Sequence, residues 1–194
     1  METLVAMAVL LAVLVGPITL IAHGLFSVSF SRNNLIASNL AQEGIELVRA
    51  VRDNNMLCIA LGATPNDTTG WNNNPNPPPP KLLDYYEIES FDVFVLTCGG
   101  FPIQTPRPIT RTLATCNTPI RINSNSIYTY TSGTPTGFTR CVQVCSPPSA
   151  APCSTVADAD IPLNDQMEVI STVSWTERGA SKNITLRDRL YRWQ

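Results

Sequence analysis

A long uncharged segment at the start of the chain constrains the fold more than any other feature. Residues 3–31 contain no Asp, Glu, Lys or Arg, and Glu2 stands immediately before them. An α-helix rises about 1.5 Å per residue, so about 20 apolar residues cross a hydrocarbon layer of about 30 Å. The segment therefore predicts a membrane-spanning helix with a carboxylate at its start. The residues expected to carry the apolar contacts are Leu4, Val5, Leu10, Leu11, Leu14, Ile18, Leu20, Ile21 and Leu25.

The pair Gly16-Pro17 interrupts this segment. Proline lacks a backbone N–H and its ring clashes with the preceding turn, so we expect a kink or local melting near residues 13–17. Neighbouring helices or side chains must satisfy the freed backbone groups if this happens in a membrane. We interpret the pair as a flexible point of the helix.

Beyond Arg32 the helical pattern continues but becomes one-sided. Apolar residues recur at three- and four-residue intervals, and charged residues occupy much of the remainder. Asn54-Asn55 is expected to end the helix. Residues 1–30 thus suit lipid, whereas residues 31–55 suit one side of a globular head. The apolar positions of the second half are Leu35, Ile36, Leu40, Ile45, Leu47, Val48 and Val51.

Six cysteines follow the uncharged segment. An even number of cysteines, in a domain that has few apolar residues and follows a membrane segment, favours disulfides in an oxidising compartment. The sequence does not determine the pairing. A zinc site and reduced buried thiols are the alternatives, but the only His is His23, inside the uncharged segment. The candidate disulfide cysteines are Cys58, Cys98, Cys116, Cys141, Cys145 and Cys153.

The rest of the chain predicts a β-rich head. Residues 56–84 are rich in Asn and Pro and are expected to form a connecting loop. Residues 85–194 contain strand signals at 85–97, 120–130, 138–144 and 167–175, and a turn at 176–179 leads to a returning strand at 183–190. The expected fold class is α+β, with the C-terminal half of a long helix packed on an antiparallel sheet.

The segments ETLVAMAVLLAVLVGPITL and NLIASNLAQEGIELVRAVRDNN resemble the N-terminal helix of type IV pilins and type II secretion pseudopilins. LAQEGIELVRAVRDNN, and WTERG followed by NITL near the C-terminus, look most like minor pilins of the PilV type. The resemblance covers about the first 55 residues well and the last 20 suggestively. It implies a pilin-like fold, and a structural subunit that polymerises through its N-terminal helix.

In this family a glutamate near the mature N-terminus helps each subunit enter the growing filament, and Glu2 matches that position. A carboxylate in hydrocarbon costs about 2–3 kcal/mol or more unless it is paired, and the α-amine of a neighbouring subunit would pair with it. The alternative is that Glu2 lies at the headgroups and favours the positive end of the helix. Gly16 and Pro17 would serve assembly as the flexible point.

The resemblance also implies partners and locations. They are the inner membrane before assembly, the pilus assembly platform, and other pilin subunits in an extracellular filament with a role such as adhesion. A peptidase of this family cuts a short basic leader after glycine. The chain begins Met1-Glu2, so neither that cleavage site nor N-methylation of the new terminus is predicted from its residues. The rival hypotheses are a secretion pseudopilin and a single-pass anchored extracytoplasmic binding domain that does not polymerise.

Other functions find little support in the sequence. Net charge is −2 and charged residues make up 14% of the chain, so nucleic acid is not an expected partner. The only basic cluster lies near the C-terminus, and we expect it to be a solvated hairpin face. The sequence shows no glycine-rich phosphate loop and no Cys-His or Ser-His-Asp set, so we predict no enzyme activity and no cofactor. The basic cluster is Arg178, Lys182, Arg187, Arg189 and Arg192.

Three acidic residues and two short motifs have the residue types of binding or modification sites. Asp158, Asp160 and Asp165 could bind Ca2+, but they lack a full loop spacing and are expected to be polar loop residues. The segments 66–68 and 183–185 match the glycosylation acceptor pattern, and such short matches carry little weight.

Overall fold

The structure is a computed structural model, and it describes residues 2–62, 85–98, 101–111, 114–149 and 153–192. Within some strands and at two helix positions, Leu14 and Ala22, only the backbone is described. Most of the expected connecting loop, residues 63–84, lies outside the described residues, as does the acceptor motif at 66–68.

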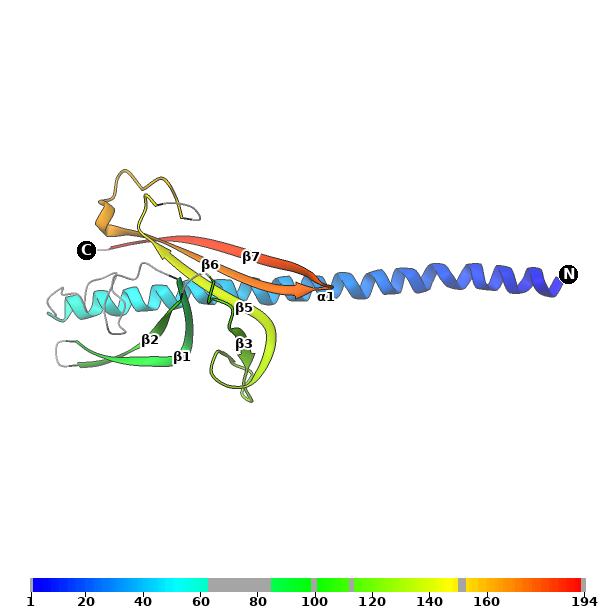
Figure 1. Ribbon diagram of the computed structural model, residues 1–194, viewed down its shortest axis with the longest axis horizontal. Coiled ribbons are helices and arrows are strands. Elements are labelled where there is room, and N and C mark those ends of the chain that lie inside the picture. The colour runs from blue at the N-terminus through cyan, green and yellow to red at the C-terminus, as the bar shows by residue number, and fades with distance from the viewer. Residues whose placement is uncertain (1, 63–84, 99–100, 112–113, 150–152, 193–194) are drawn as a thin grey trace. The chain divides into compact units, whose positions relative to one another are not determined.

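A single helix, α1 (Glu2–Ala60), accounts for the first part of the chain (Figure 1). The expected stop at Asn54-Asn55 is wrong, because Asn55 is buried and the helix continues until Leu61 and Gly62 turn, where Gly62 adopts a positive φ of 88°. The local melting expected at residues 13–17 is also absent, since the helix is unbroken through Pro17. One missing hydrogen bond does not break this helix, and Thr19 Oγ1 donates to Gly16 O at 2.7 Å on the next turn.

The chain divides into two compact units, Met1–Ile36 and Ala37–Gln194. The first contains only the N-terminal part of α1. The second, called the head below, contains the remainder of α1 and all the strands. The head is therefore an α+β unit built from one helix segment and an antiparallel sheet, as the sequence predicts.

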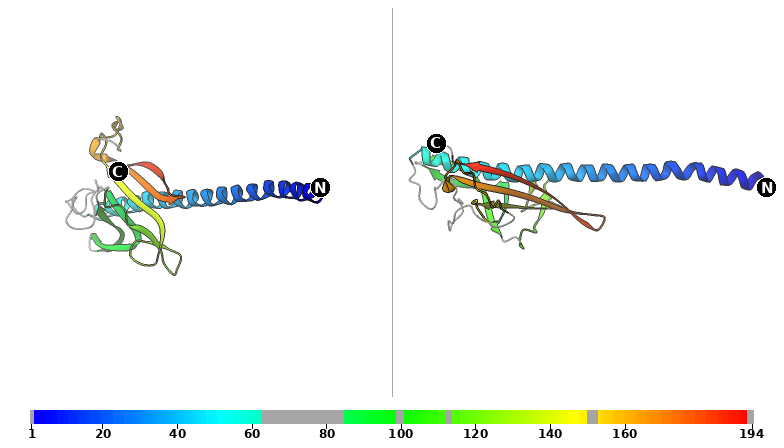
Figure 2. Two further views of the ribbon diagram at one scale, coloured as in Figure 1. Left: turned by 45° about the vertical axis from the view of Figure 1, so that its right-hand side comes forward. Right: turned by 90° about the horizontal axis from the view of Figure 1, so that it is seen from above.

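Seven strands form one antiparallel sheet in the described part of the head. The central strand, β5 (Thr134–Cys145), pairs with β6 (Gln166–Glu177) along one edge. Its other edge pairs with β3 (Pro119–Ile122) at the start and with β1 (Tyr85–Cys98) near the end. The remaining strands are β2 (Phe101–Arg111), β4 (Tyr128–Thr129) and β7 (Ala180–Tyr191), followed in Figures 1 and 2.

The sheet differs from the sequence prediction in two places. The strand expected at 120–130 is two short strands, β3 and β4, joined by a turn in which Asn123 Oδ1 accepts hydrogen bonds from the backbone N–H groups of Asn125 and Ile127. The predicted strands do not include 101–111, where β2 lies, and the prolines Pro102, Pro106 and Pro108 are unfavourable within a central strand. It is an edge strand that pairs only with β1, so its outer edge has no ladder bonds for proline to remove.

One face of the sheet packs on the helix. Side chains alternate between the two faces of a strand, so Phe138, Arg140, Val142 and Val144 of β5 share one face. This inner face meets α1 in an apolar core, with the helix lying along the strands in Figure 2. The core residues are Ile45, Leu47, Val48, Val51, Tyr86, Ile88, Val142, Val144, Met167, Val169 and Leu190.

Gly44 is the point of closest approach between helix and sheet. A Cβ at this position would lie 2.6 Å from Ser171 Oγ, 2.9 Å from Val142 Cγ2 and 3.2 Å from Arg140 Cδ. Glycine in a helix interior is unfavourable by about 1 kcal/mol relative to alanine. The head therefore loses some helix propensity at Gly44, and in return the helix backbone can lie close to β5 and β6.

We expect Gly44→Ala to lower the free energy of unfolding of the head by about 1–3 kcal/mol, because the added methyl group overpacks the interface. Ser171 Oγ is buried without a hydrogen-bond partner, so Ser171→Ala removes the closest clashing atom at little cost. The double variant should therefore lose less stability than Gly44→Ala alone.

Denaturant unfolding of the full chain in detergent, followed by tryptophan fluorescence, measures these differences. The matched control is Gln42→Ala, at an exposed position of the same helix segment, which should leave stability unchanged or slightly raised. Equal midpoints for Gly44→Ala and Gln42→Ala would contradict the close approach.

Candidate assembly surface and the network that supports it

The N-terminal part of α1 presents a long, predominantly apolar surface. Every described side chain from residue 2 to residue 32 is exposed. The exposed fractions include 70% for Leu4, 64% for Leu11 and 67% for Leu25, and the side chain of Leu14 is not described. Among the described residues, α1 is the one helix that is long and apolar enough to cross a membrane. A surface of this kind is stable only when lipid or other protein covers it.

The carboxylate and guanidinium groups of this surface lie at its two ends, whereas Thr19, His23, Ser27 and Ser29 are polar residues within it. Glu2 is exposed in the first turn of α1, where the partial positive charge of the helix end favours a carboxylate. Arg32 is exposed at the other end. Gly16 and Gly24 have open space where a Cβ would stand, so neither is required by a contact within the chain.

Arg140 connects the helix to three other parts of the head. Its side chain is only 3% exposed, and Nη1 donates to Leu40 O at 2.9 Å and to Glu43 Oε2 at 3.0 Å. Nη2 donates to Ile88 O of β1. The guanidinium also lies 5.8 Å from the ring centroid of Tyr130, whose hydroxyl donates to Arg140 O at 3.2 Å. Burial raises the pKa of Tyr130, which keeps this phenol neutral as a donor.

A second set of contacts ties α1 to β7. Arg49 Nη2 donates to Asp188 Oδ2 at 2.6 Å, and this hydrogen bond raises the pKa of Arg49. One turn further along, the buried side chain of Arg52 donates to Tyr191 O at 3.3 Å. The last strand is thereby fixed to the helix by charged groups as well as by Leu190 in the core.

Two disulfides join loops to the outer face of the sheet, which points away from the helix. Cys116 pairs with Cys141 and Cys145 pairs with Cys153, and Cys58 is also disulfide-bonded. The disulfide bonding expected from the even cysteine count is thus present, whereas the side chain of Cys98 is not described. Cys141 and Cys145 stand four residues apart on β5 and therefore share one face.

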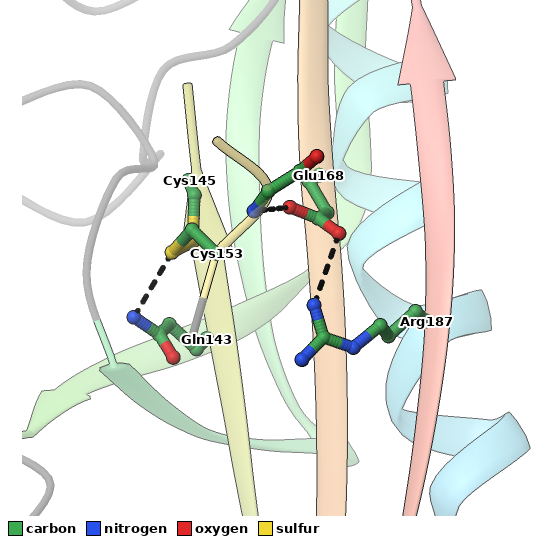
Figure 3. The surroundings of a disulfide bond; sticks show 6 residues. Gln143, Cys145, Cys153, Glu168 and Arg187 are labelled. Carbon is green, nitrogen blue, oxygen red and sulfur yellow. Dashed lines mark hydrogen bonds and ion pairs between the residues drawn. A yellow bond between two sulfur atoms is a disulfide. The ribbon is translucent and has the colours of Figure 1, made fainter. Parts of the chain in front are cut away.

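The Cys145–Cys153 bond covers a polar and apolar cluster on the outer face (Figure 3). Ile170 is 3% exposed beneath the two sulfur atoms, and Gln143 Nε2 lies 3.3 Å from Cys153 Sγ. Beside them, the buried carboxylate of Glu168 accepts a hydrogen bond from Ser154 N at 2.5 Å and pairs with Arg187 Nη1 at 3.4 Å. Glu168 therefore fixes the start of the loop that follows Cys153.

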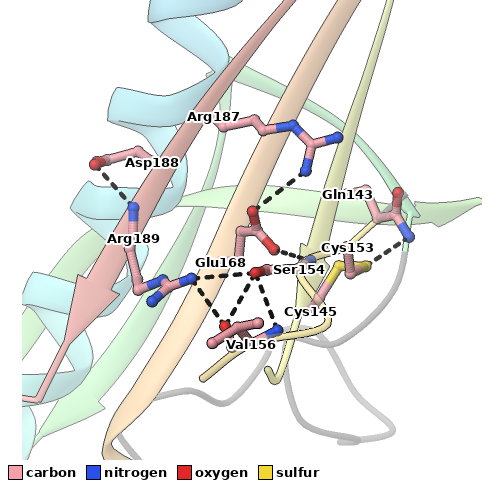
Figure 4. A network of polar contacts seen from close by, with 9 residues as sticks. All are labelled: Gln143, Cys145, Cys153, Ser154, Val156, Glu168, Arg187, Asp188 and Arg189. Atoms are coloured by element: carbon pink, nitrogen blue, oxygen red, sulfur yellow. Dashed lines mark hydrogen bonds and ion pairs between the residues drawn. A yellow bond between two sulfur atoms is a disulfide. The ribbon is translucent and has the colours of Figure 1, made fainter. Parts of the chain in front are cut away.

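The basic residues near the C-terminus form internal contacts in the head. Arg187 pairs with Glu168, and Arg192 Nη1 lies 3.5 Å from Asp165 Oδ1. Arg189 Nη2 donates to Ser154 Oγ at 3.3 Å and to Val156 O at 3.1 Å (Figure 4). Three of the five basic residues of the predicted cluster thus make contacts within the head.

The three loop aspartates do not meet at one point. Asp158 Oδ2 accepts a hydrogen bond from the hydroxyl of Tyr191 at 3.0 Å, and Asp165 pairs with Arg192. Among the described residues, no three His, Cys, Asp or Glu side chains lie together in a way that could hold a metal ion. Asn183 is exposed on β7, and the hydroxyl of Thr185 lies 3.1 Å from that of Thr172.

Sequence reasoning missed Arg140, Gly44 and Glu168, although two of them carried a signal. An isolated glycine within a helical pattern indicates a close backbone approach, which is the role of Gly44. The alternation of Phe138, Arg140 and Val142 places Arg140 on the apolar face of its strand. No local pattern distinguished Glu168, because its partners Ser154 and Arg187 are far from it in the sequence.

We expect Arg140→Met to lower the free energy of unfolding by about 3 kcal/mol, because it leaves the buried acceptors Leu40 O and Ile88 O without this donor. Glu43→Gln should cost less than about 1 kcal/mol, since the Glu43 side chain is 32% exposed and water can replace the arginine. The loss of unfolding free energy for Arg140→Lys should lie between these two values, because one ammonium group cannot reach acceptors on both α1 and β1.

Thermal unfolding of the full chain in detergent tests this order of stabilities. Arg121→Met is the matched control, because Arg121 donates one exposed hydrogen bond, to Gly133 O at 3.1 Å. If Arg121→Met lowered the stability of the protein as much as Arg140→Met does, Arg140 would have no special role in docking the helix.

Comparison of the chain with protein-family models, with curated proteins and with solved structures finds no match. The likeness to pilins therefore rests on the sequence features described above.

Proposed function

We propose that this chain is a structural subunit of a type IV pilus or a related filament, held in the inner membrane and polymerising through its N-terminal helix. The observation that carries the proposal is the length of the exposed apolar surface. Residues 3–31 would extend about 44 Å as a helix, whereas a bilayer core is about 30 Å thick. Phe26, Val28 and Phe30 remain 49%, 67% and 45% exposed beyond the first 20 or so apolar residues.

A simple anchor has no need of these extra apolar residues, although a tilted helix can accommodate some of them. A bundle of identical helices would cover them along their whole length. Burying them in this way removes apolar surface from water at about 25 cal/mol per Å2. The disulfides in the head agree with a location outside the cytoplasm, where such bonds persist.

Glu2 has a definite role in this proposal. Within a helix bundle its carboxylate would lie among apolar side chains, and the α-amine of the neighbouring subunit would neutralise it. Any other axial register would leave both charges unpaired in a medium of low dielectric constant. The resemblance to PilV-type proteins favours a minor subunit. A secretion pseudopilin would use the same chemistry in a shorter structure.

We expect Glu2→Ala and Glu2→Gln to reduce the amount of this protein in sheared filaments by about tenfold or more, which corresponds to the loss of about 1.4 kcal/mol per contact. Membrane insertion should be unchanged, because the substitutions make the helix more apolar. Glu2→Asp, which keeps the charge, should retain more assembly than Glu2→Gln.

Immunoblots of sheared and membrane fractions give the comparison, with Thr3→Ala as the control at the adjacent exposed position. A wild-type protein that never leaves the membrane fraction would favour the anchored binding domain instead. Unchanged assembly of both Glu2 variants would remove the proposed role of the carboxylate.

A further inference from the structure

One loop of the head combines a firmly held backbone with exposed apolar side chains. We call residues 153–165 the distal loop. Val156 is 68% exposed and Leu163 is 53% exposed, and no other large apolar side chain in the described part of the head is as exposed as these two. Asp160 is exposed between them in the sequence, and its carboxylate takes part in no hydrogen bond or ion pair among the described residues.

The backbone of the distal loop is held at both ends. Ser154 N donates to Glu168, and Val156 O accepts from Arg189, as Figure 4 shows. Further along, the side chain of Gln166 accepts from Asp158 N at 2.8 Å and donates to Asp158 O at 3.0 Å and to Ile161 O at 2.9 Å. The loop therefore presents Val156 and Leu163 with little of the ordering cost that a flexible loop would pay on binding.

A surface of net positive charge lies at the turn between β6 and β7, where Arg178 and Lys182 outnumber Glu177. We call residues 177–182 the hairpin tip. Arg178 and Lys182 are exposed there, and Gly179-Ala180 between them have no bulky side chain. Arg178 and Gly179 adopt positive φ values of 52° and 77°, which fix a tight two-residue turn. The backbone at the tip is thus accessible between two cations.

The distal loop and the hairpin tip lie at opposite ends of β6. The strand has 12 residues, with the distal loop before Gln166 and the tip after Glu177, so about 37 Å separates the two ends. The loop contains Asp158, Asp160 and Asp165 and no Lys or Arg. Arg192 offsets the charge of Asp165, which leaves Asp160 as the exposed carboxylate that can meet a cation.

We propose that the distal loop of one subunit binds the hairpin tip of a second copy of this chain, with Asp160 facing Lys182, and with Val156 and Leu163 packed on Gly179-Ala180. The inference rests on the proposed filament function and adds the contact between heads. Two different patches that pair between copies form a heterologous interface, which repeats without closing unless the rotation makes a ring. The head itself would thereby favour linear growth.

The geometry of the head sets how two copies would meet. Because the loop and the tip lie at opposite ends of β6, two heads displaced from each other by about the length of β6 along this strand bring the tip of one to the loop of the other.

Charge reversal tests the pairing in the full chain in cells. We expect Lys182→Glu and Asp160→Lys each to lower the yield of sheared filaments by about fivefold, as for the loss of about 1 kcal/mol. Combining the two substitutions should restore the yield. The matched control combines Lys182→Glu with Glu46→Lys. This double variant has the same net charge as the first, but the new lysine stands at an exposed position outside the distal loop, so the filament yield should stay low.

A photo-reactive phenylalanine analogue at position 156 provides the second measurement. We expect an adduct of two copies in sheared filaments, with the crosslink mapping to residues 177–182. Adducts only with a different protein, or single reversals that assemble like wild type, would overturn this inference and leave the filament function standing. Absence of the wild-type protein from sheared filaments would instead remove the filament function itself.

Discussion

The buried guanidinium of Arg140 is the interaction on which the arrangement of the head depends. It bonds to the helix at Leu40 and Glu43 and to β1 at Ile88, and it lies against the ring of Tyr130. Both Nη groups bond to backbone or carboxylate acceptors, whereas Nε has no hydrogen-bond partner among the described residues. Burying a charge is costly unless such bonds are made, so the helix can occupy few other positions on the sheet. Gly44 lies one helical turn after Leu40 and lets the backbone of α1 approach β5 and β6 closely. Charge and close packing therefore specify the same docking geometry.

The two faces of the sheet have different partners, and the alternation of side chains on β5 decides which residue serves each. Arg140, Val142 and Val144 meet the helix. Cys141 and Cys145 point to the opposite face, where their disulfides hold the segments around Cys116 and Cys153. Because the head has a small apolar core, these covalent cross-links add to its stability. The same face supports the distal loop, so the proposed contact between heads depends on Glu168 and Arg189 as well as on the residues that would touch the partner.

Much of the fold was predictable because it follows from local periodicity. The apolar stripe of the helix, the alternation at Met167–Trp175 and the turn at 176–179 each depend on neighbours in the sequence. Predictions failed where a distant contact overrides a local signal. Asn55 is buried within the head and α1 continues through it, and the prolines of β2 are accepted at an unpaired edge. Asn123 ends a strand early by accepting two backbone hydrogen bonds.

The sequence by itself determined that this chain has a long apolar helix, a β-rich part with disulfide-forming cysteines, and a carboxylate at the edge of an uncharged span, because each is a property of consecutive residues. Only the tertiary structure decided which cysteines pair, where the helix meets the sheet, and that most of the basic C-terminal cluster is used internally. These outcomes depend on residues far apart in the chain, such as Arg49 and Asp188, whose separation becomes 2.6 Å only on folding.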